Sequence, residues 1–240
     1  MTNFFNIAVK KIIETRWKYY LFSSSVRVCG NGKLSIGKKC QIKNSRIFVT
    51  DGSELHIGND ILIDGAYIYV DGTIIVEDFA HIIGTTITVN DGSICVGHHS
   101  KLALRRIWVR FGGKLSIGKY TNINSGSEIR ADNSVEIGDF TMISYGVNIW
   151  DTNTHTLYPK EKRRDITISY WPYFGKEIQC PKTKPIKIGS DCWLGQNVSI
   201  LKGSEIGNGT IVGYHTIISN RIIEENKIVV SHLDVNIFDL

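Results

Sequence analysis

The stretch "IGSDCWLGQNVSILKGSEIGNGTIVGYHTIISN", from Ile188 to Asn220, places an aliphatic residue at every sixth position. These positions are Ile188, Leu194, Ile200, Ile206, Val212 and Ile218. Neither the helical period of about 3.6 residues nor the alternation of a strand accounts for a strict period of six. A coil of about three short strands does, with one inward aliphatic residue per side and Gly, Asn or Asp at the corners, where a positive φ is easy. The stretch therefore predicts a parallel β-helix whose stacked coils bury a column of Ile, Leu and Val.

The repeat extends toward the N-terminus in longer units. Turn-like pairs recur in steps of 20, 20, 20, 21 and 20 residues: Asn31-Gly32, Asp51-Gly52, Asp71-Gly72, Asp91-Gly92, Gly112-Gly113 and Asp132-Asn133. Self-similarity at a fixed period is typical of a solenoid. Because these units are longer than three sixes, they predict an extra residue or two at one corner of each coil. We place the β-helix at residues 31–226.

The N-terminal segment differs from the repeats. In "NFFNIAVKKIIETRWKYYLF", from Asn3 to Phe22, apolar residues alternate with charged ones. This pattern favours an amphipathic helix that caps the open end of the solenoid, within residues 1–30. A helix on a membrane surface is the alternative, because Lys10, Lys11 and Arg16 lie among aromatic residues. Residues 227–240 form a tail without a readable signal.

Composition narrows the function classes. The net charge of +5 is mild for a nucleic-acid binder, and the five cysteines form no CxxC pair that would indicate a zinc ribbon. The first twenty residues lack the continuous apolar core of a signal peptide, and no uninterrupted apolar run is long enough to be a transmembrane segment. We therefore expect a cytoplasmic, folded protein that binds no nucleic acid.

One segment interrupts the repeat. From "IWDTNTHTLYPKEKRRD" (Ile149–Asp165) onward, no period of six is visible across residues 150–185. The segment contains Trp150, Tyr158, Tyr170, Trp171, Tyr173 and Phe174 and is too aromatic for a disordered loop. Insertions in solenoids map to one face, often the binding face. We expect this loop to cover an external site, on its own or a neighbouring subunit.

The period of six, together with the stretch from Ile188 to Asn220, resembles the hexapeptide-repeat acyltransferases, most closely the bacterial sugar and capsule O-acetyltransferases. The resemblance implies a left-handed β-helix of triangular section. It also implies acetyl-CoA as co-substrate, a saccharide acceptor, no metal, and a homotrimer with its active sites between subunits.

The same resemblance assigns candidate residues. His155 matches the essential histidine of the family, and a neutral imidazole can remove the proton of an acceptor hydroxyl during attack on a thioester. Asp151, four residues upstream, is a candidate to orient that ring. The acceptor candidates are Trp150, Trp193, Arg163 and Arg164, the last two from the charge run Lys160–Asp165. The acetyl-CoA candidates are Trp193, Gly195, Gln196, Gly213, Tyr214 and Arg221.

The C-terminus departs from the family pattern. In "IIEENKIVVSHLDVNI", Ile223 replaces an expected proline, and Asn220 stands where a lysine is expected near the nucleotide phosphates. Arg221 or Lys227 would have to serve the 3′-phosphate of CoA. The way in which the adenine end is held therefore stays open.

The resemblance favours O-acetylation of a bacterial surface polysaccharide, in capsule or lipopolysaccharide, with sialic acid among the acceptors. N-acetylation of an amino sugar differs only in the acceptor. A zinc enzyme of the γ-carbonic-anhydrase type is less favoured, because the two members of the only close histidine pair, His98 and His99, are adjacent and point in different directions. A non-catalytic scaffold would lack His155 and the Trp193 signature. Cys192 occupies a slot of small buried residues, which disfavours it as a nucleophile.

Overall fold

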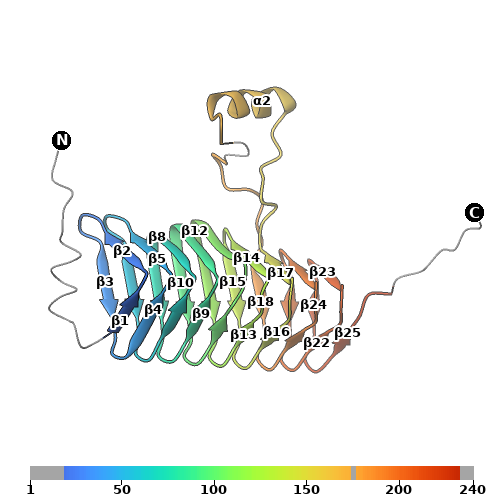
Figure 1. Ribbon diagram of the computed structural model, residues 1–240. Coiled ribbons are helices and arrows are strands. Elements are labelled where there is room, and N and C mark those ends of the chain that lie inside the picture. Colours follow the sequence, from blue (N-terminus) through green and yellow to red (C-terminus); the bar gives the residue numbers. More distant parts are fainter. Residues whose placement is uncertain (1–18, 174–176, 233–240) are drawn as a thin grey trace, which may run out of the picture.

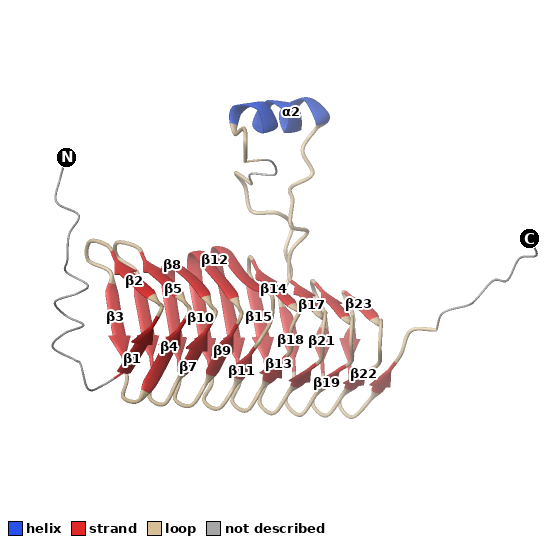
Figure 2. Cartoon of the chain, in the orientation of Figure 1, coloured by secondary structure: helices blue, strands red, loops and turns tan. Residues whose placement is uncertain are grey.

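The computed structural model describes residues 19–173 and 177–232. Short strands wind around one axis and stack along it as a parallel β-helix, from the N-terminal coil at one end to the C-terminal coil at the other (Figures 1 and 2). Every pair of named strands is parallel, as it must be when each coil repeats the last. The predicted all-β fold is confirmed.

The strands form three ladders along the axis. The first is a 10-stranded sheet: β1 (Tyr19–Phe22), β4 (Cys40–Lys43), β7 (Leu62–Asp64), β9 (His81–Ile83), β11 (Lys101–Leu102), β13 (Asn122–Ile123), β16 (Met142–Ile143), β19 (Trp193–Leu194), β22 (Ile211–Val212) and β25 (Ile228–Val229). The second runs through β2 (Ser25–Val28), β5 (Arg46–Val49), β8 (Tyr67–Val76), β10 (Thr86–Val96), β12 (Arg106–Ile117), β14 (Glu128–Ala131), β17 (Asn148–Trp150), β20 (Ser199–Leu201) and β23 (Ile217–Ser219). The third contains β3 (Lys33–Ile36), β6 (Glu54–Ile57), the second halves of β8, β10 and β12, and then β15 (Ser134–Ile137), β18 (Ile186–Ile188), β21 (Glu205–Ile206) and β24 (Ile222–Ile223).

The predicted aliphatic column is the core. All six positions from Ile188 to Ile218 are at most 2% exposed, and corresponding residues of earlier coils lie directly below them. Small polar residues fill the inner corners and bond to the next coil. The hydroxyl of Thr121 donates to the carbonyl of Gly138 at 2.8 Å, and that of Thr141 donates to Gly189 at 2.9 Å. These bonds satisfy polar groups that burial would otherwise leave without a partner.

The extra residues of the longer coils lie at one corner, between the second and third ladders. The turn-like pairs occupy this corner, and β8, β10 and β12 run through it without a break. Coils approach so closely here that a Cβ on Gly92, whose φ is 148°, would lie 2.4 Å from the carbonyl oxygen of Gly113. The long insertion also leaves from this corner, between β17 and β18.

The ends of the β-helix differ from the prediction. The first coil begins with β1 at Tyr19, so residues 19–28 form strands and not part of a helical cap. Residues 1–18, which carry the rest of the predicted cap, lie outside the described residues. At the other end β25 extends the solenoid into the predicted tail. No helix in the described part of the chain has the length and apolar character needed to cross a membrane.

Substitution of a core residue tests the stacked column. Leu102 on β11 is 0% exposed, whereas Lys101 beside it is exposed. We expect Leu102→Ala to lower the free energy of unfolding by about 2–5 kcal/mol, because it removes buried apolar surface and leaves a cavity. Lys101→Ala should change it by less than about 0.5 kcal/mol. Urea unfolding followed by circular dichroism measures both, and equal effects would contradict the assignment of inward and outward residues.

Candidate active site

The inserted loop leaves and returns at the same corner through a short two-stranded stalk. The backbone N–H of Lys184 donates to the carbonyl of Asp151 at 3.0 Å, and that of Asn153 donates to Lys182 at 3.0 Å. Beyond the stalk, residues Lys160–Ser169 form helix α2, which stands away from the solenoid in Figure 1. The charge run Lys160–Asp165 is therefore the first part of a helix, and its side chains other than Arg163 are exposed.

His155 lies on the stalk and is paired with a glutamate. Its Nδ1 is 2.7 Å from Oε1 of Glu177, on the returning segment. The His155 side chain is 54% exposed, whereas that of Glu177 is 1% exposed. Because an ionised carboxylate can only accept, Nδ1 carries the proton and Nε2 is left to accept one.

Glu177 is held from three sides. Besides His155, it accepts the backbone N–H of Thr156 at 3.0 Å and Nη2 of Arg163 at 3.0 Å. Burial raises the pKa of Glu177, but these hydrogen bonds outweigh burial and hold its pKa below the usual range. The carboxylate is therefore ionised at neutral pH and fixes the orientation of the imidazole.

Arg163 occupies a position behind the histidine. Its Nη2 also donates to the carbonyl of Thr156 at 3.1 Å, and its guanidinium lies 4.8 Å from the ring centroid of Tyr158. Arg163 was predicted to contact the acceptor, but its hydrogen bonds go to the loop itself. Arg164, the other predicted acceptor residue of the run, is exposed on α2.

Asp151 does not orient His155 and that prediction is wrong. Its side chain is fully buried, and its two carboxylate oxygens accept the backbone N–H groups of Asp132 and Asn133, each at 2.8 Å. Burial raises the pKa of Asp151 to about 6, against these hydrogen bonds, which lower it. Asp151 anchors the root of the loop to the preceding coil. No pattern in the sequence singles out Glu177 instead, because its contact with His155 exists only once the stalk has closed.

The candidates for acetyl-CoA contact form a strip on the first ladder and the corner that follows it. Trp193 on β19 and Tyr214 after β22 are 53% and 63% exposed, and Gln196 lies between them on the surface. The N–H groups of Gly195 and Gly213 donate to Val212 and Val229 of the following coils, each at 2.8 Å. These two N–H groups are thus engaged in the ladder and are not free to donate to a ligand.

Close packing against the next coil explains why glycine occupies positions 195 and 213. A Cβ on Gly195 would lie 2.9 Å from the backbone nitrogen of Tyr214, and one on Gly213 would lie 2.8 Å from Cγ1 of Val230. Both positions need glycine because the next coil comes so close. The exposed side chains of Trp193, Gln196 and Tyr214 remain as the surface that a ligand can contact.

Within one chain, His155 and this strip lie on different sides of the coil. The loop leaves at the top of Figure 2, whereas β19 and β22 line the bottom. Arg221, predicted to bind acetyl-CoA, lies between β23 and β24, at the corner from which the loop departs and away from Trp193. Trp150 also lies on the side of the loop, as the last residue of β17.

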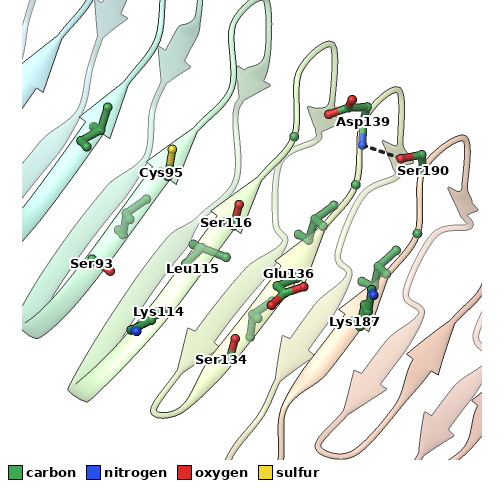
Figure 3. A pocket seen from close by; sticks show the side chains of 18 of the residues that line it. Ser93, Cys95, Lys114, Leu115, Ser116, Ser134, Glu136, Asp139, Lys187 and Ser190 are labelled. Carbon is green, nitrogen blue, oxygen red and sulfur yellow. Dashed lines mark hydrogen bonds between the residues drawn. The ribbon is translucent and has the colours of Figure 1, made fainter.

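A shallow groove of about 630 Å³ follows the third ladder, and Figure 3 shows it lined by small side chains such as Ser93, Cys95 and Ser116 with Lys114 and Glu136 beside them. It includes none of the predicted site residues. We do not assign the active site to this groove, because the histidine and the exposed aromatic strip lie elsewhere.

The other titratable groups considered from the sequence have structural surroundings. Cys192 is 1% exposed, and burial raises the pKa of its thiol, which makes it a poor nucleophile. His98 and His99 contact each other through their Nδ1 atoms at 2.9 Å, and His99 stacks between Phe79 and Tyr120. Across residues 19–173 and 177–232, no group of three or more His, Cys, Asp or Glu side chains is arranged to hold a metal ion.

The coils that follow the loop match a known protein family. Residues 185–220 match the family described as "Bacterial transferase hexapeptide (six repeats)". These coils are thus similar to the hexapeptide repeats of bacterial transferases. The resemblance expected from the period of six is thereby confirmed. The matched residues include Trp193, Gln196 and Tyr214, so the exposed strip lies within the hexapeptide repeats.

Two curated relatives share part of the chain. The "Putative lipopolysaccharide biosynthesis O-acetyl transferase WbbJ" of Escherichia coli (strain K12) is 31% identical over 123 residues, which is 51% of this chain and 60% of that protein. The "Probable acetyltransferase Rv3034c" of Mycobacterium tuberculosis is 29% identical over 129 residues, 54% of this chain and 34% of that protein. The chain thus spans less than two thirds of the length of either relative. The crystal structure of the polysialic acid O-acetyltransferase OatWY has the same fold, with a TM-score of 0.50 and 22% identity over 88% of this chain and 93% of that one.

The buried carboxylate at the root of the loop predicts a pH dependence of stability. The pKa of Asp151 in the folded protein is raised to about 6. The protonated carboxyl therefore makes its full contribution to the free energy of unfolding below about pH 4, and this contribution is lost as the pH rises through 6. The loss amounts to at most about 3 kcal/mol. Asp151→Asn cannot titrate, so it should gain stability relative to the wild type as the pH rises.

Urea unfolding at intervals from about pH 4 to pH 7 measures this difference. Asp165→Asn, which changes an exposed carboxylate on α2, is the matched control. A difference between wild type and Asp151→Asn that stays constant with pH would contradict the account of this carboxylate.

Proposed function

We propose that the protein is an acetyl-CoA-dependent O-acetyltransferase that acetylates a sugar hydroxyl of a bacterial surface polysaccharide. The observation that carries the proposal is the pair of His155 and Glu177, which orients an exposed imidazole beside a hexapeptide-repeat solenoid. The names of WbbJ and Rv3034c as acetyltransferases support the reaction class. Acetyl-CoA is a cytoplasmic metabolite, and the proposal therefore places the reaction in the cytoplasm.

In this reaction His155 acts as general base. Its Nε2 takes the proton of the acceptor hydroxyl while the hydroxyl oxygen attacks the thioester carbon, and the resulting imidazolium returns the proton to the leaving thiolate. Glu177 stabilises the imidazolium through Nδ1, as a buried carboxylate does in other histidine-dependent enzymes. Arg163 holds Glu177 in place and keeps it ionised.

The distribution of residues within one chain supports active sites between subunits. Acetyl-CoA bound along Trp193, Gln196 and Tyr214 would lie on the first ladder, whereas His155 is presented on the opposite side of the solenoid. The stalk and α2 project away from their own β-helix (Figure 1). A neighbouring copy therefore supplies the missing half, and a closed ring of three copies repeats the same contact three times.

Substitution of the histidine tests the chemistry. We expect His155→Ala to lower kcat about 10²–10⁴-fold, because it removes the general base. Glu177→Gln should lower kcat about 10–100-fold while leaving KM for acetyl-CoA unchanged, because it disturbs only the orientation of the ring. Acetyl-CoA consumption with a polysaccharide acceptor measures both effects. Glu161→Gln, an exposed carboxylate on α2, is the control, and a wild-type rate in His155→Ala would refute the mechanism.

Complementation tests the shared site. His155→Ala and Trp193→Ala subunits should each be inactive, but their mixed trimers contain sites with an intact histidine from one chain and an intact tryptophan from the other. Random assembly of equal amounts should restore about a quarter of the wild-type activity. Two affinity tags on co-expressed subunits verify that mixed oligomers form. Verified mixed trimers without activity would place both residues in sites within one chain.

A further inference from the structure

Three arginines surround one buried glutamate on the second ladder, outside the site described above. Glu128 at the start of β14 is 0% exposed, and its carboxylate accepts hydrogen bonds from Arg105, Arg106 and Arg130. Burial raises the pKa of Glu128, but the three guanidinium groups outweigh burial and hold it below the usual range. The carboxylate is therefore ionised, and the cluster carries two positive charges in excess.

Among the described residues, Glu128 is the only carboxylate that forms an ion pair with these three arginines. The next pair along the ladder, Arg110 and Asp132, is buried and neutral as a unit, with a bidentate contact at 2.8 and 2.6 Å. The side chain of Arg105 is 62% exposed and that of Arg106 is 34% exposed, so the surplus charge reaches the surface. Such a charge distribution attracts anions.

Stacked rings and guanidinium groups hold the cluster rigid. Arg130 lies between Trp108 and Trp150, with its guanidinium carbon 5.6 and 4.5 Å from the two ring centroids. Arg106 lies 5.2 Å from the ring centroid of Trp108. Arg106 Nε and Trp150 Nε1 are buried and have no hydrogen-bond partner among the described residues. The surface itself therefore combines excess positive charge with partly exposed indole rings.

This surface lies close to the segment that carries His155. Trp150 is the last residue before the inserted loop, and Arg110 Nη2 lies 3.3 Å from the carbonyl oxygen of Thr154, next to His155. The cluster occupies the coils before the loop, whereas Trp193 and Tyr214 lie on coils after it. A ligand on the arginine cluster would thus reach His155 from the coils before the loop, on the side of the solenoid opposite to the strip of Trp193 and Tyr214.

We propose that Arg105, Arg106, Arg130 and the indole rings of Trp108 and Trp150 bind the acceptor, an acidic saccharide chain that carries carboxylates. This inference rests on the proposed function, since it names the acceptor class of the same reaction. Arginine forms directed hydrogen bonds to carboxylates, and indole rings pack against the apolar faces of sugars. Coils repeat every 4.7–4.9 Å or so, so the three coils of the cluster cover about 10 Å along the axis.

Direct binding of saccharides, without acetyl-CoA, tests the inference. Isothermal titration calorimetry compares a hexamer of sialic acid and a hexamer of galacturonic acid with neutral maltohexaose. We expect the acidic hexamers to bind, more weakly as salt increases, and maltohexaose to bind at least tenfold more weakly. The double variant Arg105→Gln/Arg106→Gln should weaken binding of the acidic hexamers at least tenfold. Arg105→Lys/Arg106→Lys should restore part of the affinity, because it keeps the charge.

Arg46→Gln is the matched control. Arg46 is exposed on the same ladder and lies in the same register column as Arg106, three coils earlier and away from Glu128. It should bind the acidic hexamers as the wild type does. Thermal unfolding of each variant verifies that it is folded.

The inference is overturned if the wild type binds no acidic hexamer, if maltohexaose binds equally well, or if the arginine variants bind like the wild type. Displacement of the hexamer by acetyl-CoA would also overturn it, because the cluster would then hold the phosphates of CoA. A different result would refute the proposed function: the wild type would consume no acetyl-CoA with any saccharide acceptor.

Discussion

The parallel hydrogen bonding of each coil to the next is the constraint on which the rest of the structure depends. Once Ile149 on β17 is in register with Ile129 on β14 and Ile200 on β20, an insertion within β17 would disrupt the pairing with both neighbouring strands. Extra residues can enter only at a corner, and they must leave and return there. The stalk from Asp151 to Lys184 meets this condition, because its two segments bond to each other directly above the corner. A rigid solenoid thus presents a histidine on a loop whose root cannot shift.

Buried charges fix the loop at its root. Asp151 accepts two backbone N–H groups of the preceding coil, and Arg110 pairs with Asp132 while it contacts the carbonyl of Thr154. Removing one partner of a buried pair leaves an uncompensated charge, so these contacts define one geometry even where their net contribution to stability is small. The charges at Glu128 are not balanced in this way, because three arginines pair with one carboxylate. We attribute this excess of positive charge to ligand binding.

The sequence predicted the fold because a period of six directly reports the geometry of a coil. Leu194, Ile200 and Val212 were assigned to the core from spacing alone, and all three are buried. The partner of His155 could not be predicted in this way. Glu177 is 22 residues away along a segment without periodicity, and only closure of the stalk brings the two side chains together. Asp151 was nearer in sequence, but the corner directs its carboxylate into the preceding coil.

In the proposed arrangement, one chain supplies His155 and another supplies the surface for acetyl-CoA. A crystal structure of the protein with CoA bound would test both contacts at once. We predict that the CoA thiol lies beside Trp193 of one copy and within about 4 Å of Nε2 of His155 from its neighbour, close enough for proton transfer directly or through one water. A thiol bound beside Trp193 with no histidine of a neighbouring copy near it, or bound beside His155 of the same chain, would contradict this arrangement.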